Sequence, residues 1–416
     1  MVITLVMDQY GMLNNGTTAT ARHFAEKMRE RGHTVRIVTC IPNVSEPDIY
    51  LVKERKIPFF TRLIHSHGMV LASGDEKVLT DAIRGADVVH FFLPFQLARA
   101  GKKIADRLGV PSVAAFHAQP ENITYNIKVE RFGINRILYA AWRRFFNRFS
   151  HIHVPSEMMK SLLLKHGYQS EIHAISNGVH PVFAKRDAAR PSEFEGKYLI
   201  TMSGRLAREK RQADIIRAAG KSKYNDRIQL VFCGKGPLEG RLKRLGAKLL
   251  KNQPVIKFCG RDALIDTLNY CDLYVHASEI ESEAIACMEA FSCGKVPIIS
   301  DAKYSATKQF ALSPHSLYKN RDSSDLAAKI DWMIEHPEEK ARLERAYLEF
   351  AEKFRLDVCV PQLENVFMRA IRECADARKP YYVPEELYAQ ESYGASEFSD
   401  ESELLDADEA VGYAGN

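Results

Sequence analysis

The feature that most constrains the fold is a repeated unit in which a short apolar run precedes a polar loop and an amphipathic segment. The first unit has an apolar run at Val2–Met7, a loop at Asp8–Gly16 and an amphipathic stretch at Thr18–Arg31. A second apolar run follows at Thr34–Thr39. These periodicities indicate a strand, a loop, a helix and a second strand. Strands that alternate with helices predict a parallel sheet covered on both faces.

The unit occurs in two series, separated by a polar stretch at residues 184–196. Further strands are predicted at Val88–Leu93, Val113–His117, His151–Val154, Tyr198–Ser203, Ile228–Cys233, Val255–Phe258, Leu273–His276 and Val296–Ser300. A chain of 416 residues is too long for one ordinary core. We therefore expect an α/β protein with two Rossmann-like, doubly wound domains facing a central cleft, in which ligands bind. The predicted domains span residues 1–190 and 191–375, and the extension at 376–416 ends in an acidic tail expected to be disordered.

The net charge of +5 is unevenly distributed along the chain. Residues 381–416 carry ten acidic side chains and no Lys or Arg, which leaves +15 for residues 1–380. The strong positive charge of residues 1–380 favours an anionic partner, such as a nucleotide, nucleic acid or acidic lipid headgroups. The alternative is a solvated, Lys-rich surface with no such partner. Because no helix-turn-helix, zinc or RNA-recognition motif accompanies the charge, we do not expect nucleic acid to be the partner.

The eight cysteines are scattered, mostly in apolar runs, and form no C-x-x-C pair. They predict buried thiols in a reducing compartment. No apolar stretch approaches the roughly 20 residues that a membrane-spanning helix needs. We therefore expect a cytoplasmic location, with peripheral binding to the inner face of the plasma membrane as a further possibility.

The segment MSGRLAREK at residues 202–210 is a candidate phosphate site, because it follows a predicted strand and opens a helix. Gly204 allows a sharp turn and a close approach to a ligand, and a helix N-terminus offers free N–H groups to a diphosphate. Arg205 and Lys210 could neutralise the phosphates. The alternative is that both side chains are simply solvated.

Two glutamates eight residues apart, Glu281 and Glu289, form the second candidate site. Glu289 falls in an apolar helix predicted to begin near Ser282–Ala284 and to end at Cys293-Gly294. A buried carboxylate is costly unless it is paired or bound to hydroxyls, and sugar and ribose hydroxyls are suitable donors. The alternative is an acidic cluster at the helix N-terminus, stabilised by the helix dipole, which would explain Glu279, Glu281 and Glu283 but not Glu289.

Glu281-x7-Glu289, followed by Ala290 and Cys293-Gly294, resembles the E-x7-E signature of the retaining glycosyltransferases of family 4, which have the two-Rossmann GT-B fold. Over roughly residues 1–375 the order of other landmarks is similar as well. These are Asn15-Gly16, His117, Val154-Pro155-Ser156, Asn177-Gly178-Val179, Gly204-Arg205-Leu206 with Lys210, and Gly234-Lys235-Gly236-Pro237. The resemblance implies a hexosyltransferase that uses a nucleotide-diphosphate sugar.

The resemblance also implies roles for individual residues. Arg205 and Lys210 would hold the donor diphosphate, Glu289 the ribose hydroxyls and Glu281 the transferred sugar, while His117 would face the reacting carbon. His117, Glu281, Arg205 and Lys210 are thus the expected catalytic set. The expected donor-binding set is Gly16, Gly204, Arg205, Lys210, Gly234, Glu281, Ser282, Glu283, Ala284, Ile285 and Glu289.

The donor implied by the resemblance is UDP-glucose, although the sequence itself does not distinguish glucose from galactose, mannose or N-acetylglucosamine. The family mechanism would retain the anomeric configuration without a protein nucleophile. No Asp-x-Asp sequence lies near the phosphate motifs, so we expect no metal and no other cofactor.

One departure from the family pattern is Ser282-Glu283-Ala284, which stands where Gly-Phe-Gly is usual. The extra carboxylate of Glu283 either points away from the dianionic donor or binds a hydroxyl. This segment and the later run Ser305–Leu312 resemble bacterial transferases similar to diacylglycerol and sterol glucosyltransferases. A membrane lipid is therefore the expected acceptor, with a polysaccharide intermediate on a lipid carrier as the alternative.

Residues 128–149 combine six basic side chains with six aromatic ones. A basic, aromatic amphipathic helix is typical of a segment at an anionic membrane interface. The expected membrane-contact residues are Arg131, Arg136, Trp142, Arg143, Arg144 and Phe145. The alternative is a helix whose aromatic face is buried in the core.

Two other classes of function compete with glycosyl transfer. A dinucleotide-dependent oxidoreductase would need G-x-G-x-x-G after a strand. Gly234 and Gly236 start such a pattern, but Gly240 comes four residues later where the pattern needs three. A two-domain protein that binds a nucleotide-sugar without turnover is the non-enzymatic alternative.

Overall fold

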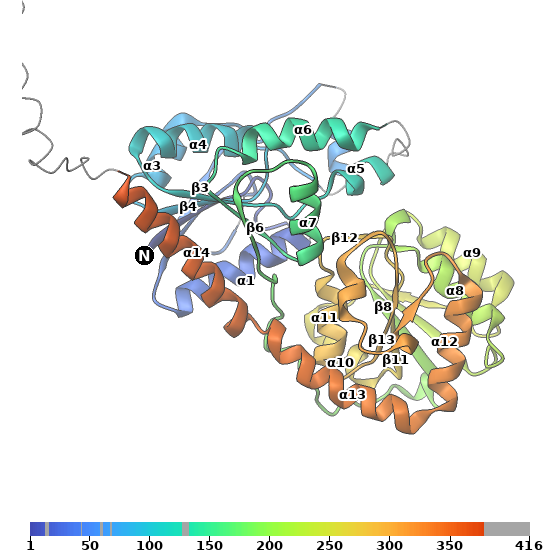
Figure 1. Cartoon of the computed structure of the whole chain (residues 1–416). Helices are drawn as coiled ribbons and strands as arrows, with labels where there is room; N and C mark the ends of the chain where they lie inside the picture. The colour runs from blue at the N-terminus through green and yellow to red at the C-terminus, as the bar shows by residue number, and fades with distance from the viewer. Residues whose placement is uncertain (13–15, 43, 59–60, 67–68, 127–132, 378–416) are drawn as a thin grey trace, which may run out of the picture. The chain divides into compact units, whose positions relative to one another are not determined.

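The computed structural model describes residues 1–12, 16–42, 44–58, 61–66, 69–126 and 133–377, and it contains two parallel sheets (Figure 1). The first has the strand order β3-β2-β1-β4-β5-β6-β7, and the second has the order β10-β9-β8-β11-β13-β15. In each sheet the chain starts in the middle, winds to one edge and then winds to the other. The predicted pair of doubly wound sheets is therefore confirmed.

The first sheet comes from the N-terminal half of the chain. Its strands are β1 (Val2–Val6), β2 (Thr34–Thr39), β3 (Ile49–Leu51), β4 (Val88–Phe91), β5 (Ser112–Ala115), β6 (His151–Val154) and β7 (Glu171–Ala174). The described helices of this half are α1 (Gly16–Glu30), α2 (Thr61–Ser66), α3 (Glu76–Ile83), α4 (Gln96–Leu108), α5 (Pro120–Asn126), α6 (Ile134–Phe146) and α7 (Glu157–Lys165).

The second sheet comes from the C-terminal half. Its strands are β8 (Tyr198–Ser203), β9 (Ile228–Cys233), β10 (Val255–Lys257), β11 (Leu273–His276), β13 (Pro297–Ser300) and β15 (Leu317–Tyr318), and β12 (Ile280–Glu281) pairs separately with β14 (Tyr304–Ser305). The α-helices are α8 (Gln212–Lys221), α9 (Glu239–Leu249), α10 (Arg261–Tyr270), α11 (Ile285–Ser292), α12 (Ser323–Glu335), α13 (Pro337–Ala351) and α14 (Leu356–Asp376). Short 3₁₀ helices are η2 (Ser192–Phe194), η3 (Arg208–Lys210), η4 (Ala306–Phe310), η5 (Pro314–Ser316) and η6 (Glu352–Phe354).

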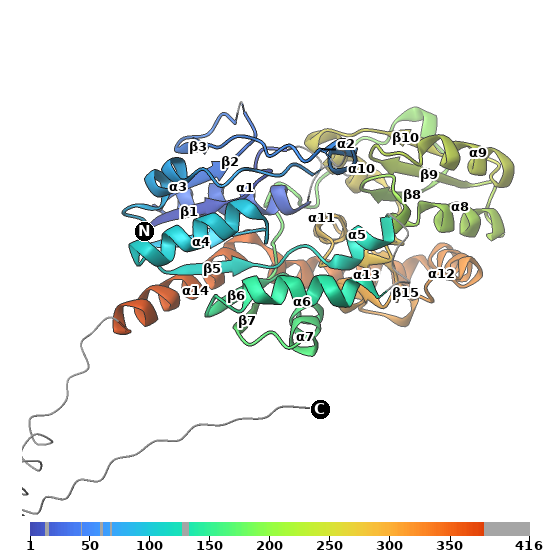
Figure 2. The same cartoon turned by 90° about the horizontal axis from the view of Figure 1, so that it is seen from above.

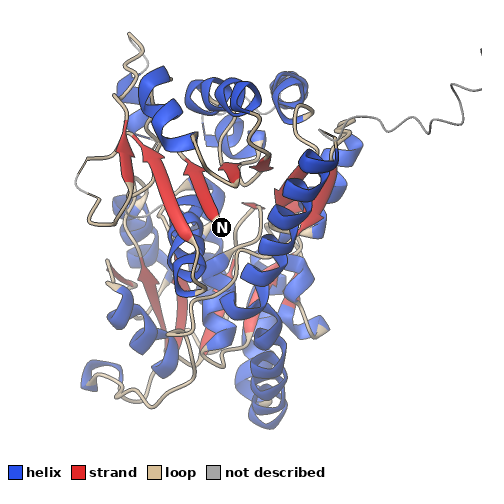
Figure 3. Ribbon diagram, turned by 90° about the vertical axis from the view of Figure 1, so that its left-hand side faces the viewer, coloured by secondary structure: helices blue, strands red, loops and turns tan. Residues whose placement is uncertain are grey.

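Each face of the first sheet carries its own hydrophobic core, and helices flank the strands in Figure 3. One core gathers apolar side chains of α3, α4, α6 and α7. The other gathers those of α1 and, from the far end of the chain, α14 (Figures 1 and 2). The last described helix therefore packs on the first sheet, although it follows the second sheet in sequence. The domain limits at residues 190 and 375 stay a prediction.

The chain crosses between the two sheets along two neighbouring segments. The Val179 amide donates to the Phe354 carbonyl at 2.7 Å, and the Leu356 amide donates to the Val179 carbonyl at 3.2 Å. Gly178, just before, has φ +73°, and a side chain there would come within 2.7 Å of Leu356. Only glycine fits such a close approach in a left-handed conformation without strain.

No described helix combines the length and apolar composition that a bilayer span needs. The predicted acidic tail lies outside the described residues.

We expect the packing of α14 to stabilise the first half strongly. Phe367 is 1% exposed in the core that α14 shares with the first sheet, whereas Val358 on the same helix is 41% exposed. Phe367→Ala should lower the free energy of unfolding by about 3–5 kcal/mol, because it removes a large buried ring. Val358→Ala should change it by less than about 1 kcal/mol. Urea unfolding of both variants makes the comparison, and equal effects would contradict this assignment of α14.

Candidate functional site

The candidate site forms where the strand order of the second sheet reverses. β8 lies between β9 and β11, so the loops that follow β8 and β11 leave the sheet in opposite directions. Ligands of open parallel sheets bind in the crevice that this divergence leaves beyond the strand ends. The loop after β8 contains Gly204 to Lys210, and the loop after β11 leads to Glu281. The two motifs predicted to form the site are therefore brought together.

A partly buried ion pair joins these two loops. The Lys210 Nζ bonds the Oε1 of Glu281, and the Nε2 of His276 lies 3.1 Å from the same oxygen. Burial alone would raise the pKa of Glu281, but Lys210 and His276 together hold it well below its ordinary value. Burial likewise opposes the charge of Lys210, yet Glu281 raises its pKa above the usual value. Both groups are therefore charged at neutral pH.

A row of polar side chains behind the ion pair orients His276. The Tyr274 hydroxyl lies 3.4 Å from His276 Nδ1 and 3.3 Å from the Ser203 hydroxyl. Burial lowers the pKa of His276, so the ring is neutral when its nitrogens make these contacts. Sequence reasoning missed His276, although a histidine that ends a strand next to a predicted phosphate loop is a usable signal.

The glycines of the site allow the loops to pack closely. Gly204 has φ +137°, and a Cβ on Gly234 would lie only 1.9 Å from the Gly204 carbonyl oxygen. The backbones of the loops after β8 and β9 are therefore in direct contact. This contact alone requires glycine at position 234, whether or not Gly234 also binds a ligand. Arg205 lies half-buried in this loop, and its carbonyl accepts from Gln212 Nε2 at 2.9 Å.

The turn at Ser282–Ala284 leads into α11. Ala284 has φ +78°, a left-handed conformation that costs a non-glycine residue roughly 1–2 kcal/mol. The amides of Cys287 and Met288 donate to the Ala284 carbonyl, and those of Ile285 and Ala286, at the N-terminus of α11, are the ones that can bind an anion. Glu289 lies one turn further along, and its carboxylate has no hydrogen bond or ion pair with the described residues. Burial raises its pKa to about 7, and Arg261 partly opposes this.

Glu283 does not point toward the ion pair. Its Oε2 accepts from the Asn177 amide at 2.9 Å, on the segment that connects the two sheets, and its Oε1 is buried without a partner in the described part of the chain. Burial raises the pKa of Glu283 to about 8. Of the two alternatives from the sequence, the structure favours the one in which this carboxyl points away from a donor. The expected donor contact of its side chain is not supported.

His117 follows β5 in the first half and is buried. Its ring stacks on Phe92 at 5.6 Å, and neither ring nitrogen has a partner among the described residues. Burial keeps the pKa of His117 well below its usual value, so the ring is neutral. The Ser282 hydroxyl donates to the His117 carbonyl at 2.9 Å, which places the two residues side by side. Gly16 is the exposed first residue of α1, and residues 13–15 before it lie outside the described chain.

Three further hydrogen bonds tie first-half residues to the loop after β11. Gln119 Nε2 donates to the Glu281 carbonyl at 3.4 Å, and the Ser156 hydroxyl donates to the Ser282 carbonyl at 2.7 Å. The Tyr125 hydroxyl of α5 donates to Glu279 at 3.1 Å. The loop that carries Glu281 is thus held from both halves.

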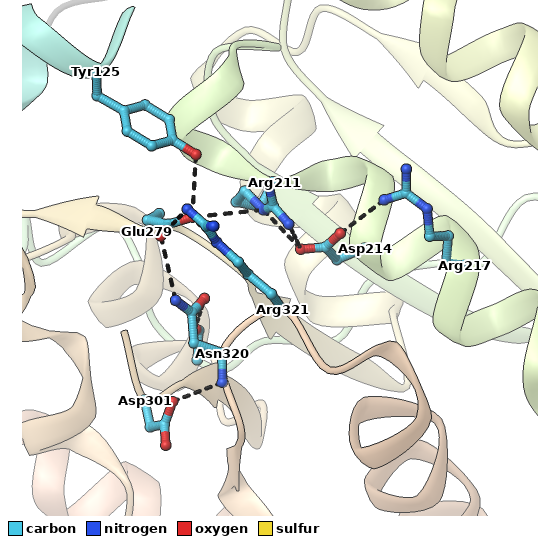
Figure 4. Close-up of polar contacts among 9 residues, drawn as sticks. Tyr125, Arg211, Asp214, Arg217, Glu279, Asp301, Asn320 and Arg321 are labelled. Carbon is cyan, nitrogen blue, oxygen red and sulfur yellow. Dashed lines mark hydrogen bonds and ion pairs between the residues drawn. The ribbon is translucent and has the colours of Figure 1, made fainter. Parts of the chain in front are cut away.

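Glu279 is the centre of a network that the sequence did not reveal (Figure 4). Arg321 donates to both of its oxygens, at 2.6 and 3.0 Å, Asn320 donates at 3.4 Å, and Arg211 lies 3.7 Å away. These partners hold the pKa of Glu279 below its usual value despite burial, which acts the other way. Arg321, Asn320 and Arg211 lie about 40 to 70 residues from Glu279 in the sequence, so no local sequence pattern predicts these contacts.

The predicted membrane contact through the aromatic side chains of α6 is wrong. Trp142 and Phe145 are 7% and 3% exposed, because the first sheet offers them an apolar surface within the chain. Arg143 donates to the His166 carbonyl at 2.8 Å, and of the proposed residues that the structure describes, Arg136 and Arg144 alone are exposed. Arg131 lies outside the described residues.

The pKa of Glu283 predicts how stability depends on pH. In the folded protein the Glu283 carboxyl, with a pKa near 8, keeps its proton at pH values where the unfolded chain, with a pKa of 4.5, has released it. The free energy of unfolding therefore falls as the pH rises from 4.5 to 8. The loss is on the order of 4–5 kcal/mol over that range. Glu283→Gln, which cannot ionise, should remove this component. Urea unfolding at several pH values compares the two proteins, and parallel pH curves would contradict the assignment.

Known proteins resemble the chain along most of its length. Residues 14–183 match the family model described as Glycosyltransferase Family 4, and residues 184–349 match the model described as Glycosyl transferases group 1. An alpha-monoglucosyldiacylglycerol synthase of Streptococcus pneumoniae is 24% identical over 72% of this chain and 71% of its own. A GDP-mannose-dependent alpha-mannosyltransferase of Corynebacterium glutamicum is 25% identical, over 72% of each chain.

Solved structures agree with the fold. The structure of Anabaena Alr3699/HepE in complex with UDP-glucose superposes with a TM-score of 0.70 at 16% identity, covering 89% of this chain and all of that one. Sucrose-phosphate synthase (tll1590) from Thermosynechococcus elongatus superposes with a TM-score of 0.72 at 13% identity, covering 89% of this chain and 99% of that one. With its two parallel-sheet domains, the chain has the GT-B fold and belongs to glycosyltransferase family 4.

Proposed function

We propose that this glycosyltransferase moves glucose from UDP-glucose to a hydroxyl of a membrane lipid, with retention of the anomeric configuration. The observation that carries the proposal is the hydrogen-bonded cluster of Lys210, Glu281 and His276 at the reversal of the second sheet. It pairs a cation suited to a diphosphate with a carboxylate suited to sugar hydroxyls. A relative named alpha-monoglucosyldiacylglycerol synthase supports the choice of sugar and acceptor.

The positive groups of the site would stabilise charge on the departing diphosphate. Lys210 is charged because Glu281 raises its pKa, and the first amides of α11 add the positive end of a helix dipole. Arg205, from the same loop as Lys210, would bind the other side of the diphosphate. These groups supply the positive charge that a metal ion provides in other transferases, so we propose that transfer needs no metal.

Bond making and breaking would then occur on one face of the sugar. The acceptor hydroxyl attacks the anomeric carbon as the bond from that carbon to the diphosphate oxygen breaks, and the hydroxyl proton passes to the leaving phosphate. Glu281 would accept from a sugar hydroxyl and Glu289 from the ribose hydroxyls. The neutral His117, with both ring nitrogens unpartnered among the described residues, would bind the sugar near the reacting carbon.

A groove in the first half supports a lipid acceptor at an anionic surface. It encloses about 610 Å³ between α4 and α6 and is lined by Arg55, Arg99 and Lys103 together with apolar residues that include Phe95 and Trp142. The three basic side chains are exposed. Positive charge around an apolar groove suits a lipid headgroup and the start of its acyl chains. We place the membrane contact at this groove, to which α6 contributes Trp142, instead of along the whole aromatic face of α6.

A second candidate is mannosyl transfer from GDP-mannose, which is favoured by several relatives named GDP-mannose-dependent alpha-mannosyltransferases. A glycan on a lipid carrier is the alternative acceptor, and binding of a nucleotide-sugar without turnover is the non-enzymatic alternative. Incubating the protein with membrane lipid extract and a panel of nucleotide-sugars, followed by mass spectrometry, separates these cases. Failure to release nucleoside diphosphate from any donor would overturn the enzymatic proposal.

Removing the cation of the site should abolish transfer. Lys210→Ala should lower kcat/KM by about 100-fold or more, because one lost charge partner of a leaving group typically has that effect. Lys221→Ala, on the exposed side of α8, is the matched control and should keep wild-type activity.

Lys210→Ala also leaves Glu281 without its cationic partner. The variant protein is therefore expected to melt at a lower temperature than the wild type. The double variant Lys210→Ala/Glu281→Gln removes both charges and should recover the melting temperature but not transfer. Near wild-type activity in Lys210→Ala would show that Lys210 does not hold the donor.

Charge reversal in the groove should weaken membrane binding. Arg55→Glu/Lys103→Glu should reduce affinity for phosphatidylglycerol vesicles by at least 10-fold, since each basic residue near such a surface contributes about 1 kcal/mol. Arg244→Glu/Lys248→Glu makes the same charge change on the exposed face of α9 in the second half. Vesicle co-sedimentation at low salt compares the two variants. Equal losses would show a general charge effect and no specific groove.

A further inference from the structure

Three side chains that can bind a metal ion converge at the start of the last two strands of the first sheet. His151 is the first residue of β6, and Glu171 and His173 are the first and third residues of the edge strand β7. The register pairs His151 with Glu171 and His153 with His173. Alternate residues of a strand point to the same face, so the three side chains share one face of the sheet.

Their ligand atoms lie close enough for a metal centre. His151 Nδ1 lies 3.1 Å from His173 Nε2 and 3.9 Å from Glu171 Oε2, and His173 Nε2 lies 3.8 Å from Glu171 Oε1. With one Glu171 oxygen as the third ligand, the three ligand atoms all lie within 4.8 Å of one another. A tetrahedral zinc ion with bonds of about 2.0–2.2 Å holds its ligand atoms roughly 3.3–3.6 Å apart, so the carboxylate would move toward the histidines when an ion binds.

The surrounding residues orient these ligands as protein metal sites usually require. His151 Nε2 lies 2.9 Å from Glu373 of α14, so the tautomer that donates there leaves the lone pair of Nδ1 toward the other two ligands. Carboxylates that accept from the second nitrogen of a ligand histidine are typical of metal centres. Arg369 donates to Glu171 Oε1 at 2.6 Å and to Glu373 at 2.9 Å, which holds both carboxylates in place.

The charge of the cluster favours a divalent cation. Two carboxylates, Glu171 and Glu373, outnumber the single guanidinium of Arg369, and the histidines bind metals in their neutral form. Arg369 leaves Glu171 Oε2, the oxygen nearer His151, without a hydrogen bond in the described residues. Glu171 is partly exposed, so an ion can enter and a water can complete a fourth position.

We propose that His151, Glu171 and His173 form a binding site for a zinc-like divalent ion that fastens α14 to the edge of the first sheet. The ion would bridge β6 and β7, and Glu373 would extend the link to α14. The site lies at the N-terminal ends of its strands, whereas Ser156, which contacts the loop of Glu281, follows the C-terminal end of β6. Its role is therefore structural, and glycosyl transfer does not depend on it.

Cobalt binding tests this site directly. Protein purified without a histidine tag and stripped with a chelator should bind one Co²⁺ per chain, with the visible absorption of a tetrahedral N,O site. His173→Asn should weaken Co²⁺ and Zn²⁺ binding at least 30-fold. His180→Asn, which alters a half-buried histidine beside His23, is the matched control and should bind like the wild type.

Thermal unfolding provides the second readout. Zn²⁺ should raise the melting temperature of the wild type but not of His173→Asn. If His173→Asn folds poorly, Glu171→Gln makes the same test with a partly exposed residue. A chelator should lower the melting temperature of the metal-loaded protein without lowering the transfer rate. Wild-type protein that binds no more Co²⁺ or Zn²⁺ than the variants would overturn the proposal.

Discussion

The ion pair between Lys210 and Glu281 is the interaction on which the candidate site depends. It joins the loop after β8 to the loop after β11, which leave neighbouring strands in opposite directions. Removing one partner of a fully buried pair typically costs about 3–5 kcal/mol, and the cost is smaller here because the Lys210 and Glu281 side chains are 21% and 13% exposed. The third group, His276, contacts the same carboxylate oxygen and is itself oriented by Tyr274. The cluster is therefore set before any donor arrives, which is what electrostatic stabilisation of a leaving group requires.

The three residues from Glu281 to Glu283 connect this cluster to the rest of the molecule. Glu281 faces Lys210, Ser282 donates to the His117 carbonyl, and Glu283 accepts from Asn177 on the segment between the sheets. One short stretch thus contacts Lys210, the first-half histidine and the connecting segment. A displacement of any one of them would move the other two, so the proposed site groups of both halves depend on the same three residues.

Much of this arrangement could be predicted from the sequence, because buried parallel strands are continuous apolar runs and glycines mark their ends. β2, β6, β8, β9 and β11 match their predicted limits. The strands that were missed, such as β7 and β12, are short or partly exposed and have no such run. The partners of Glu279 and Glu283 lie far away in sequence, so no local pattern could show them. Trp142 and Phe145 were misassigned because a membrane-facing and a core-facing helix have the same periodicity, and only the tertiary packing tells them apart.

The segment Ser282-Glu283-Ala284 stands where the family pattern has Gly-Phe-Gly. Its side chains fix the conformation of a turn that glycines would leave flexible. Ala284 takes a left-handed conformation that glycine would adopt without strain, and Glu283 keeps one buried oxygen without a partner in the described chain. Both features cost stability, and such costs persist where the surrounding structure enforces them, commonly at functional sites. Here the enforcement comes from hydrogen bonds to His117, Ser156 and Asn177. Alanine has fewer accessible backbone conformations than glycine, so the turn that aims the first amides of α11 is held in one shape.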